Sequence, residues 1–441
     1  MRPVPYRLGE EELVALGGGD DVTKIVERLA AAQYDGRMLL LWGVMDTARR
    51  AGHPEAERVR HGYELLARLQ RRYPGVAGEV LRHPAAGAWA FHTLRGLRGE
   101  PTGPAARPAG LAALAAAVLV KSGAEGAVEV PVVDGAVTLP SLGQAMLGTS
   151  DRFALVRSGA AGAEVIATGA RVAIPADAEA DAPGWRGMRA LAAGAGEFTI
   201  RVLVDDLDPF RMPGALVNGR LTAAEAAEWR AVFHDAWQVL VTGHPVAAAE
   251  VAAVMRAITP LERPPTGQRS ATSSEAFGAV AVSRPVDAPA LAAALVHEVQ
   301  HSKLNAVIDI VPLVRPGVGH RRYYAPWRDD PRPPAGLLQG AFAHLAVSGF
   351  WRRQRHREGG AAAIRAHAEY ARWRAGALQV TRALLTERLL TEPGKVLASA
   401  MLRTLTAWQA EPVPREAAVR ARREAELHRR RWRARNRMAI R

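Results

Sequence analysis

The sequence predicts an α+β fold that is mainly α-helical. Three observations support this: 49% of the 441 residues are hydrophobic, helical spacing of apolar residues recurs over most of the chain, and short β-type runs gather in its middle. A chain of this length has enough apolar material for two or three domains. We expect four regions: an N-terminal helical region (1–122), a β-rich region (123–212), a mainly helical region (213–412) and a basic C-terminal helix or tail (413–441).

The first region is expected to be helical from about residue 10 to residue 122. Helical periodicity occurs in VTKIVERLAAAQ, RMLLLWGVMDTARRAG and AERVRHGYELLARLQRRY, and the turn-forming stretches PGV, HPAAG and GEPTGPAARPAG interrupt it. Short strands are expected from about 127 to 205, where AVEVPVV and AVTL flank an Asp134-Gly135 turn. FALVRS, EVIATG, RVAI and FTIRVLV follow, so this part is expected to be a small meander.

Helical periodicity returns at LTAAEAAEWRAVFHDAWQVLV, which Thr222 can cap, and continues to the C-terminus. One strand-like run, AFGAVAVSRP (276–285), interrupts it. We expect an edge-type strand there, able to pair with an extended peptide.

The stretch LVHEVQHSKLNAV (295–307) contains a His-Glu-x-x-His motif. Asp287 is a candidate cap, Pro289 falls in the first turn and Pro312 follows the segment, so we expect a helix from about 288 to 309. His297 and His301 then lie one turn apart, where two imidazoles can reach one divalent ion at about 2.1 Å. The apolar surroundings favour a metal site over a surface helix, because buried imidazoles without a ligand are costly.

The absence of cysteine restricts the ligands of any metal to His, Asp and Glu. The spacer of long-spacer zinc endopeptidases is also absent, because Leu304 and Val307 occupy its positions. The stretch GHRRYYAPWR (319–328) lacks the carboxylate that other zinc peptidases take from the next helix, although His320 could substitute for it. The next helical segment (333–354) has an apolar stripe that includes His344, which we expect to be the third ligand. The alternative for His344 is a core histidine bonded to a backbone carbonyl.

LVHEVQHSKL and YYAPWRDDPRPPAGLLQGAFAHLAVSGFW (323–351) together resemble the HExxH-type peptide β-hydroxylases. These are iron(II)- and 2-oxoglutarate-dependent enzymes that modify ribosomally synthesised and post-translationally modified peptides (RiPPs). The resemblance extends more loosely through IRVLVDDLDPFR, FGAVAVS and the N-terminal helices. It implies a dioxygenase that hydroxylates Cβ of a residue in a precursor peptide. Region 213–412 would then be its zincin-like metal-binding catalytic region.

The chemistry that the resemblance implies needs particular residues. His297, His301 and His344 would offer a three-ligand face and leave positions for 2-oxoglutarate and O₂. An arginine would bind the distal carboxylate of 2-oxoglutarate, and we favour Arg328, with Arg332 and Arg322 behind it. A loop-ordering ion pair with Asp329 or Asp330 is an equal alternative for Arg328.

Glu298 distinguishes this hypothesis from a zinc peptidase or related hydrolase. In the hydrolase Glu298 is the general base that takes a proton from zinc-bound water. In the hydroxylase no such base is required, and Glu298 orients a ligand or the peptide. A non-catalytic peptide-binding module is the third hypothesis. Its metal content distinguishes it from the two enzymes, because such a module would fold and bind peptide without a metal.

Other clusters are weaker candidates. His367 and Glu369 resemble the HxD/E pair of cupin-type oxygenases, but their segment is helical, so a cupin barrel is not expected. Strand-end caps and a Pro turn explain Asp205, Asp206 and Asp208 better than a cation site does. His83 and His92 are expected to be core or cap residues.

The formal net charge of +14 is concentrated in residues 415–441, which hold 11 Arg and three Glu. No nucleic-acid motif accompanies them, so we expect a solvated helix, with an acidic peptide or nucleic acid as the less favoured partner. Cytoplasmic residence without a membrane partner is expected, because no apolar run approaches the roughly 18 to 20 residues that span a bilayer. The sequence is compatible with a homo-oligomer.

Overall fold

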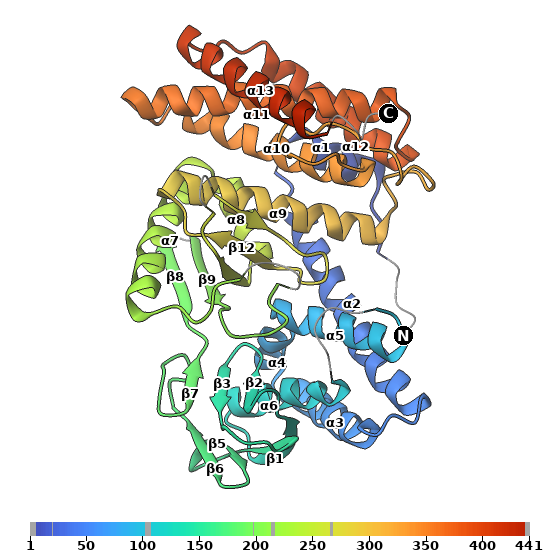
Figure 1. Cartoon of the computed structure of the whole chain (residues 1–441), viewed down its shortest axis with the longest axis vertical. Helices are drawn as coiled ribbons and strands as arrows, with labels where there is room; N and C mark the ends of the chain where they lie inside the picture. Colours follow the sequence, from blue (N-terminus) through green and yellow to red (C-terminus); the bar gives the residue numbers. More distant parts are fainter. Residues whose placement is uncertain are drawn as a thin grey trace.

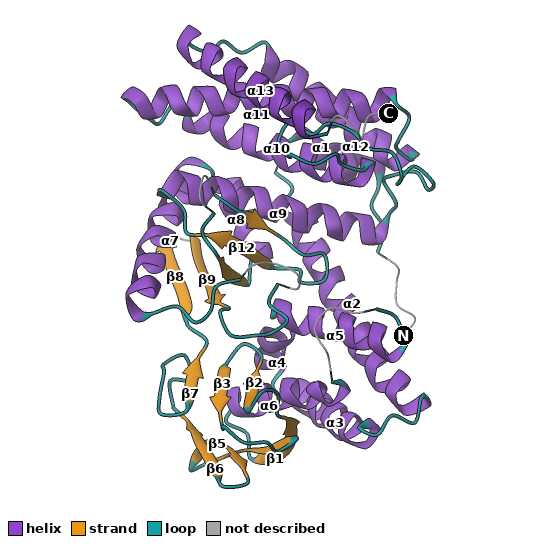
Figure 2. Cartoon of the chain, in the orientation of Figure 1, coloured by secondary structure: helices purple, strands orange, loops and turns teal. Residues whose placement is uncertain are grey.

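The computed structural model (Figure 1) describes residues 6–19, 21–101, 107–196, 198–212, 217–264 and 268–436. Within these ranges helices predominate and the strands form three small sheets (Figure 2), so the expected mainly helical α+β class is confirmed. No sheet closes into a barrel in the described part of the chain.

The N-terminal helices contribute to two hydrophobic cores. The long helix α2 (Thr23–Arg50) reaches both, because Val26 and Leu29 belong to one core and Leu41 and Val44 to the other. The helices after it pack with the small strands: α3 (Ala56–Arg72), α4 (Pro74–Leu81), α5 (Pro84–Leu97) and α6 (Leu111–Lys121), the last preceded by a 3-10 turn at Pro108–Gly110.

The first helix, α1 (Glu10–Gly18), lies apart from α3–α6. It packs against α12 (Glu392–Gln409) near the other end of the chain, where the Thr404 hydroxyl donates to the Gly18 carbonyl at 3.1 Å. Part of the expected N-terminal region therefore belongs in space to the C-terminal helices.

Two of the three sheets lie in the expected β-rich region. One has the order β1-β4-β5-β6, from β1 (Gly126–Pro131), β4 (Phe153–Gly159), β5 (Gly162–Ala167) and β6 (Ala170–Ile174). The other has the order β2-β3-β7, from β2 (Ala136–Leu139), β3 (Gly143–Met146) and β7 (Trp185–Gly187). Both are antiparallel, and β4, β5 and β6 form the expected meander.

The expected Asp134-Gly135 turn is present, with φ values of 51° and 72° that fit a type I′ turn. One antiparallel bridge, between Val133 and Ala136, closes the turn. Beyond it the strands diverge, because β1 pairs with β4 and β2 pairs with β3, so the hairpin that the turn suggests is limited to this bridge.

The third sheet is mixed and has the order β11-β12-β10-β9-β8. The strands β9 (Phe198–Val204), β10 (Ala257–Leu261) and β12 (Ala279–Ser283) are parallel, and β8 (Ala190–Ala195) and β11 (Ser270–Ala271) are antiparallel to their neighbours. The expectation of an edge strand at 276–285 is wrong, because β12 lies between β10 and β11. The short strand β11 forms that edge.

Helices α7 (Ala223–Gly243), α8 (Pro245–Val254) and α9 (Ala288–Ile310) pack against this sheet. Thr222 caps α7 as expected, since its Oγ1 accepts from the Glu225 amide at 3.2 Å. Above α9 in Figure 1 lie α10 (Pro334–Gln354), α11 (Gly360–Thr386), α12 and α13 (Arg415–Arg435).

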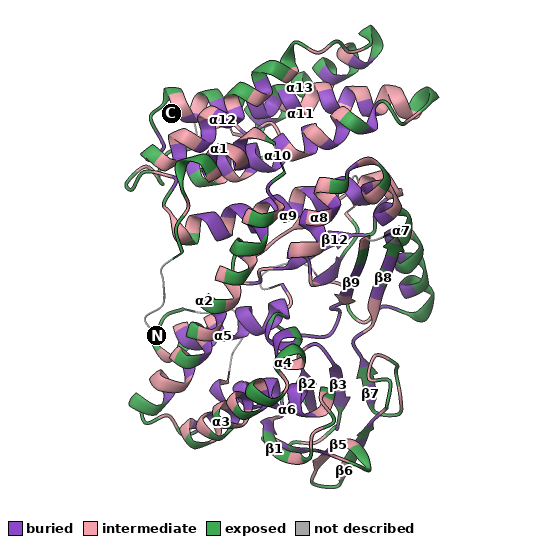
Figure 3. Cartoon of the chain, turned by 180° about the vertical axis from the view of Figure 1, so that it is seen from behind, coloured by how far each residue is buried: buried purple, intermediate pink, exposed green. Residues whose placement is uncertain are grey.

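The expected basic tail is thus a helix, α13, that packs on α11 and exposes most of its length (Figure 3). Residues 437–441 of that tail lie outside the described residues.

Candidate metal centre

Helix α9 carries the His-Glu-x-x-His motif and has the boundaries that the sequence predicts. Asp287 caps it by accepting a hydrogen bond from the Ala290 amide at 2.8 Å, and Pro289 lies in its first turn. Leu295, Val299 and Leu304 are buried, so α9 is an interior helix. Its rigid packing fixes the positions from which the motif side chains project.

His297 and His301 face each other at the edge of this core. Their Nε2 atoms are 3.1 Å apart. Two nitrogens that each bind one ion at about 2.1 Å would be separated by roughly 3 to 3.4 Å for ligand angles of 90° to 109°. The pair is therefore already spaced to hold a metal ion.

Gln339 of α10 orients one of these rings. Its Oε1 lies 2.9 Å from Nδ1 of His301, and its Nε2 donates to Asn305 Oδ1 at 2.6 Å. Because Asn305 fixes the orientation of the amide group, Gln339 Oε1 accepts a hydrogen bond from the N–H at Nδ1 of His301. The lone pair of His301 is then on Nε2, directed at His297.

Glu298 is almost completely buried, with 1% of its surface exposed. Its Oε2 accepts a hydrogen bond from the hydroxyl of Thr272, in the segment that follows β11, and its Oε1 lies 3.8 Å from Nε2 of His297. The carboxylate is thus close to the histidine pair but is already engaged by Thr272.

His344 projects from α10 toward the same pair. Its ring centroid is 4.9 Å from that of His297, and its Nδ1 donates to the Gly340 carbonyl at 2.8 Å. This backbone bond is the one expected for a core histidine, but it also leaves Nε2 as the free ring nitrogen. The indole rings of Trp327 and Trp373 cover His344, with centroids 4.3 and 4.6 Å away.

The ligand atoms that gather most closely are those of His297, Glu298 and His301, which all lie within 4.8 Å of one another. His344 contacts this group through His297 and is not part of it. Burial lowers the pKa of His297 to about 4, although Glu298 opposes the shift. Burial, and next the proximity of His297, lowers the pKa of His344 well below its ordinary range. Both imidazoles are therefore neutral at pH 7, as metal ligation requires.

The loop before α10 holds three arginines that are candidates for binding 2-oxoglutarate and one histidine that is a candidate metal ligand. These four residues lie in different places. Arg328 and Arg332 line the pocket of the histidines, and both pair with Asp330, at 2.9 and 3.0 Å. Arg322 is exposed and donates to the carbonyls of Gly319 and Arg321, away from the pocket wall. His320 is also exposed and does not line the pocket.

The pocket itself has a volume of about 810 Å³, within the range of ligand-binding sites. The sheet edge at β11 forms one wall, and α9 and α10 form the others. Arg269, next to β11, contributes a third guanidinium that has no ion-pair partner among the described residues. Sequence reasoning missed Arg269, because the stretch QRSATSS has neither a helical nor an alternating pattern.

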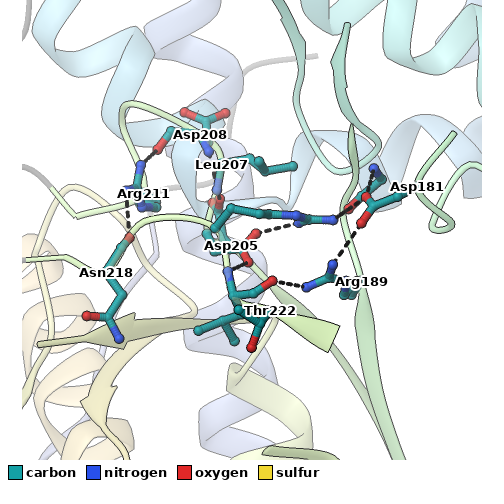
Figure 4. A network of polar contacts seen from close by, with 12 residues as sticks. Asp181, Arg189, Asp205, Leu207, Asp208, Arg211, Asn218 and Thr222 are labelled. Atoms are coloured by element: carbon teal, nitrogen blue, oxygen red, sulfur yellow. Dashed lines mark hydrogen bonds and ion pairs between the residues drawn. The ribbon is translucent and has the colours of Figure 1, made fainter. Parts of the chain in front are cut away.

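The other candidate clusters lie elsewhere. His367 and Glu369 are on α11, in the helical conformation that the sequence predicts. Asp205 and Asp208, which belong to the polar network in Figure 4, accept hydrogen bonds from the backbone amides of Asp208 and Phe210, respectively. Asp206 pairs with Arg220. The capping explanation therefore accounts for Asp205 and Asp208, and an ion pair accounts for Asp206.

His83 and His92 are buried, as expected for core or cap residues. His83 precedes the first turn of α5, and His92 lies 3.1 Å from Glu275.

Comparison with known proteins found no match, either to a protein-family model or to a curated protein. In the part of the chain that the structure describes, no helix combines the length and apolarity needed to cross a membrane. The assignment of a function therefore depends on the site itself.

Proposed function

We propose that the protein is an iron(II)- and 2-oxoglutarate-dependent hydroxylase that acts on Cβ of a residue in a ribosomally made precursor peptide. One observation carries the proposal: imidazoles from two packed helices converge on a single pocket. His301 and His344 each have Nδ1 engaged by a hydrogen-bond acceptor, so that Nε2 remains for a metal. Imidazole is a ligand that suits iron.

In this proposal His297, His301 and His344 hold the metal, and region 213–412 is a zincin-like catalytic region. Bound iron would supply the activation of O₂, in which 2-oxoglutarate becomes succinate and CO₂ and the second oxygen atom enters the peptide as hydroxyl. A guanidinium of the wall, from Arg328, Arg332 or Arg269, binds the distal carboxylate of 2-oxoglutarate. Arg322 is not included, because its side chain lies away from the wall.

Glu298 is a positioning residue in the hydroxylase. Its hydrogen bond with Thr272 connects α9 to the sheet edge that borders the pocket. The alternative is a zinc-dependent peptidase or hydrolase in which Glu298 is the general base. The 3.8 Å distance from Glu298 Oε1 to His297 Nε2 favours this second candidate, since it places the carboxylate beside a metal ligand.

The two candidates predict different products. Protein loaded with iron(II) under air should consume 2-oxoglutarate and release succinate, and His297→Ala should abolish this turnover. Protein loaded with zinc should not cleave peptides. Peptide cleavage by the zinc form, with no succinate from the iron form, would instead establish the hydrolase.

A further inference from the structure

A second cavity, of about 400 Å³, lies between α11 and α13. We call it the arginine groove, because four arginines line it: Arg372, Arg374, Arg422 and Arg429. Its lining also includes the small residues Ala371, Ala375, Gly376, Ala418, Ala421 and Ala425. The small side chains leave room for an incoming backbone to lie between the two helices.

The positive charge of the groove is only partly compensated. Arg372 pairs with Glu424 at 3.0 Å, and Glu426 is the one acidic side chain of the lining. Arg422 and Arg429 have no carboxylate partner among the described residues, although Arg429 donates to Gln379 at 2.8 Å. The α13 helix as a whole holds nine arginines and three glutamates.

Arg374 is the buried arginine of the groove lining. It is 5% exposed and donates to the carbonyls of Trp408 and Glu411, but its buried Nε has no hydrogen-bond partner in the described part of the chain. Because this Nε is closed to solvent, a ligand in the groove does not reach it, and the two carbonyl bonds make Arg374 a structural support of the groove.

The aromatic residue of the groove is not open for base stacking. The Tyr324 ring is covered by Trp432, at 5.2 Å, and by the guanidinium of Arg429, at 5.3 Å, while its hydroxyl contacts His428 at 3.0 Å. Proteins that bind single-stranded nucleic acid combine a positively charged groove with aromatic faces on which the bases stack. A partner that brings carboxylates and little bulk fits better than one that brings bases.

We propose that the arginine groove binds an acidic, extended segment of a peptide. Arg422 and Arg429 are seven residues apart on α13, which corresponds to about 10.5 Å along the helix. In a polyproline-II segment, carboxylates three residues apart lie on one face about 9.3 Å from each other. The groove therefore suits acidic residues at every third position of such a segment.

The groove and the candidate metal centre share one loop. Tyr324 and Pro326 line the groove, and the next residue, Trp327, stacks on His344. A peptide held in the groove would thus be anchored beside the loop that covers the metal pocket. Binding to the groove requires no metal, so it can be tested apart from the proposed function.

The probe is a fluorescein-labelled twelve-residue peptide with glutamate at every third position in an Ala-Pro background, titrated into the full-length protein without added metal. We expect binding that weakens with salt and a glutamine twin that does not bind. The charge-reversed double variant R422E/R429E should weaken binding at least about tenfold, while R423E/R430E, equal in charge but outside the groove, should change it less than about threefold. Thermal unfolding checks that both variants fold, and R422Q serves if the first does not.

Three results would overturn the proposal. They are equal binding of the glutamine twin, equal loss in the two double variants, and tighter binding of a single-stranded oligonucleotide that R422E/R429E abolishes.

Discussion

The indole of Trp327 lies nearly parallel to the imidazole of His344, with 4.3 Å between ring centroids and 14° between ring planes. Gly340 makes this contact possible, because a Cβ at that position would lie 2.2 Å from Nε1 of Trp327. The Gly340 carbonyl also accepts a hydrogen bond from the N–H at Nδ1 of His344. One residue of α10 therefore permits the stacking and orients the ring.

Gly340→Ala should displace Trp327 and free the His344 ring. We expect affinity for iron(II) in the presence of 2-oxoglutarate to fall by about tenfold or more, the effect usual for loss of a group that orients a ligand. Isothermal titration under anaerobic conditions measures this. Gly36→Ala in α2, where a Cβ meets nothing within 4 Å, is the control and should leave metal affinity unchanged.

Gln339→Ala should weaken metal binding, because it removes the acceptor that holds His301 with Nε2 toward His297. A loss of about 10- to 100-fold in affinity is expected. Gln339→Glu keeps an acceptor oxygen and should retain most of the affinity. Equal affinities in wild type and Gln339→Ala would show that His301 does not depend on this bond.

Glu298→Gln should leave measurable hydroxylation, because the amide can still accept a hydrogen bond from Thr272 and hydroxylation requires no proton transfer by this side chain. In a zinc hydrolase the same variant would lose nearly all activity, since general-base catalysis contributes about 10²- to 10⁴-fold. Succinate release is the assay. Peptide cleavage that the wild type shows and Glu298→Gln loses, with no succinate released by either protein, would support the hydrolase.

The fold should lose stability in acid through His83. Burial lowers the pKa of His83 from 6.5 to about 3, and the charges of Arg37 and Lys121 add to the shift. Only the unfolded chain then gains a proton between these pH values, so the His83 contribution is complete above pH 6.5 and declines below it, by up to about 1.4 kcal/mol per pH unit. The 3.5 Å contact of neutral His83 with Asp205 is therefore not an ion pair at pH 7.

The neighbouring carboxyls act in the opposite direction. Burial raises the pKa of Asp208 to about 6 and that of Asp205 well above its ordinary range. Their contribution to stability grows as the pH falls. The pH dependence of the wild-type free energy of unfolding is therefore the difference between the histidine effect and the carboxyl effect. Denaturant unfolding of His83→Gln at pH 7, 6 and 5 should show a smaller loss in acid than the wild type. The exposed His61→Gln should match the wild type.

Features of α9 could be predicted because they depend on local chemistry. Asp287, Pro289 and the four-residue spacing of His297 and His301 determine the start and the motif face of the helix without tertiary information. The approach of His344 could also be anticipated, because its place in an apolar stripe directs it into the helix interface.

The wall of the pocket could not be predicted, because tertiary pairing creates it. The strand β10 is five residues long, buried throughout, and contains Pro260, so neither alternation nor composition marks it. Without β10 the parallel pairing of β12 cannot be predicted, and the sequence therefore predicts the edge at β12 and not at β11. Gln339 and Arg269 gain their roles only from positions that the assembled sheet and helices define.

An anaerobic difference spectrum of the protein with iron(II) and 2-oxoglutarate tests the proposed hydroxylase most directly. If the protein is a hydroxylase, the wild type should show a visible charge-transfer band from a 2-oxo acid chelated to iron, and His344→Ala should lose it. No band in the wild type, together with tightly held zinc in the purified protein, would contradict the hydroxylase and leave hydrolysis as the function. A band that persists in His344→Ala would remove His344 from the ligand set.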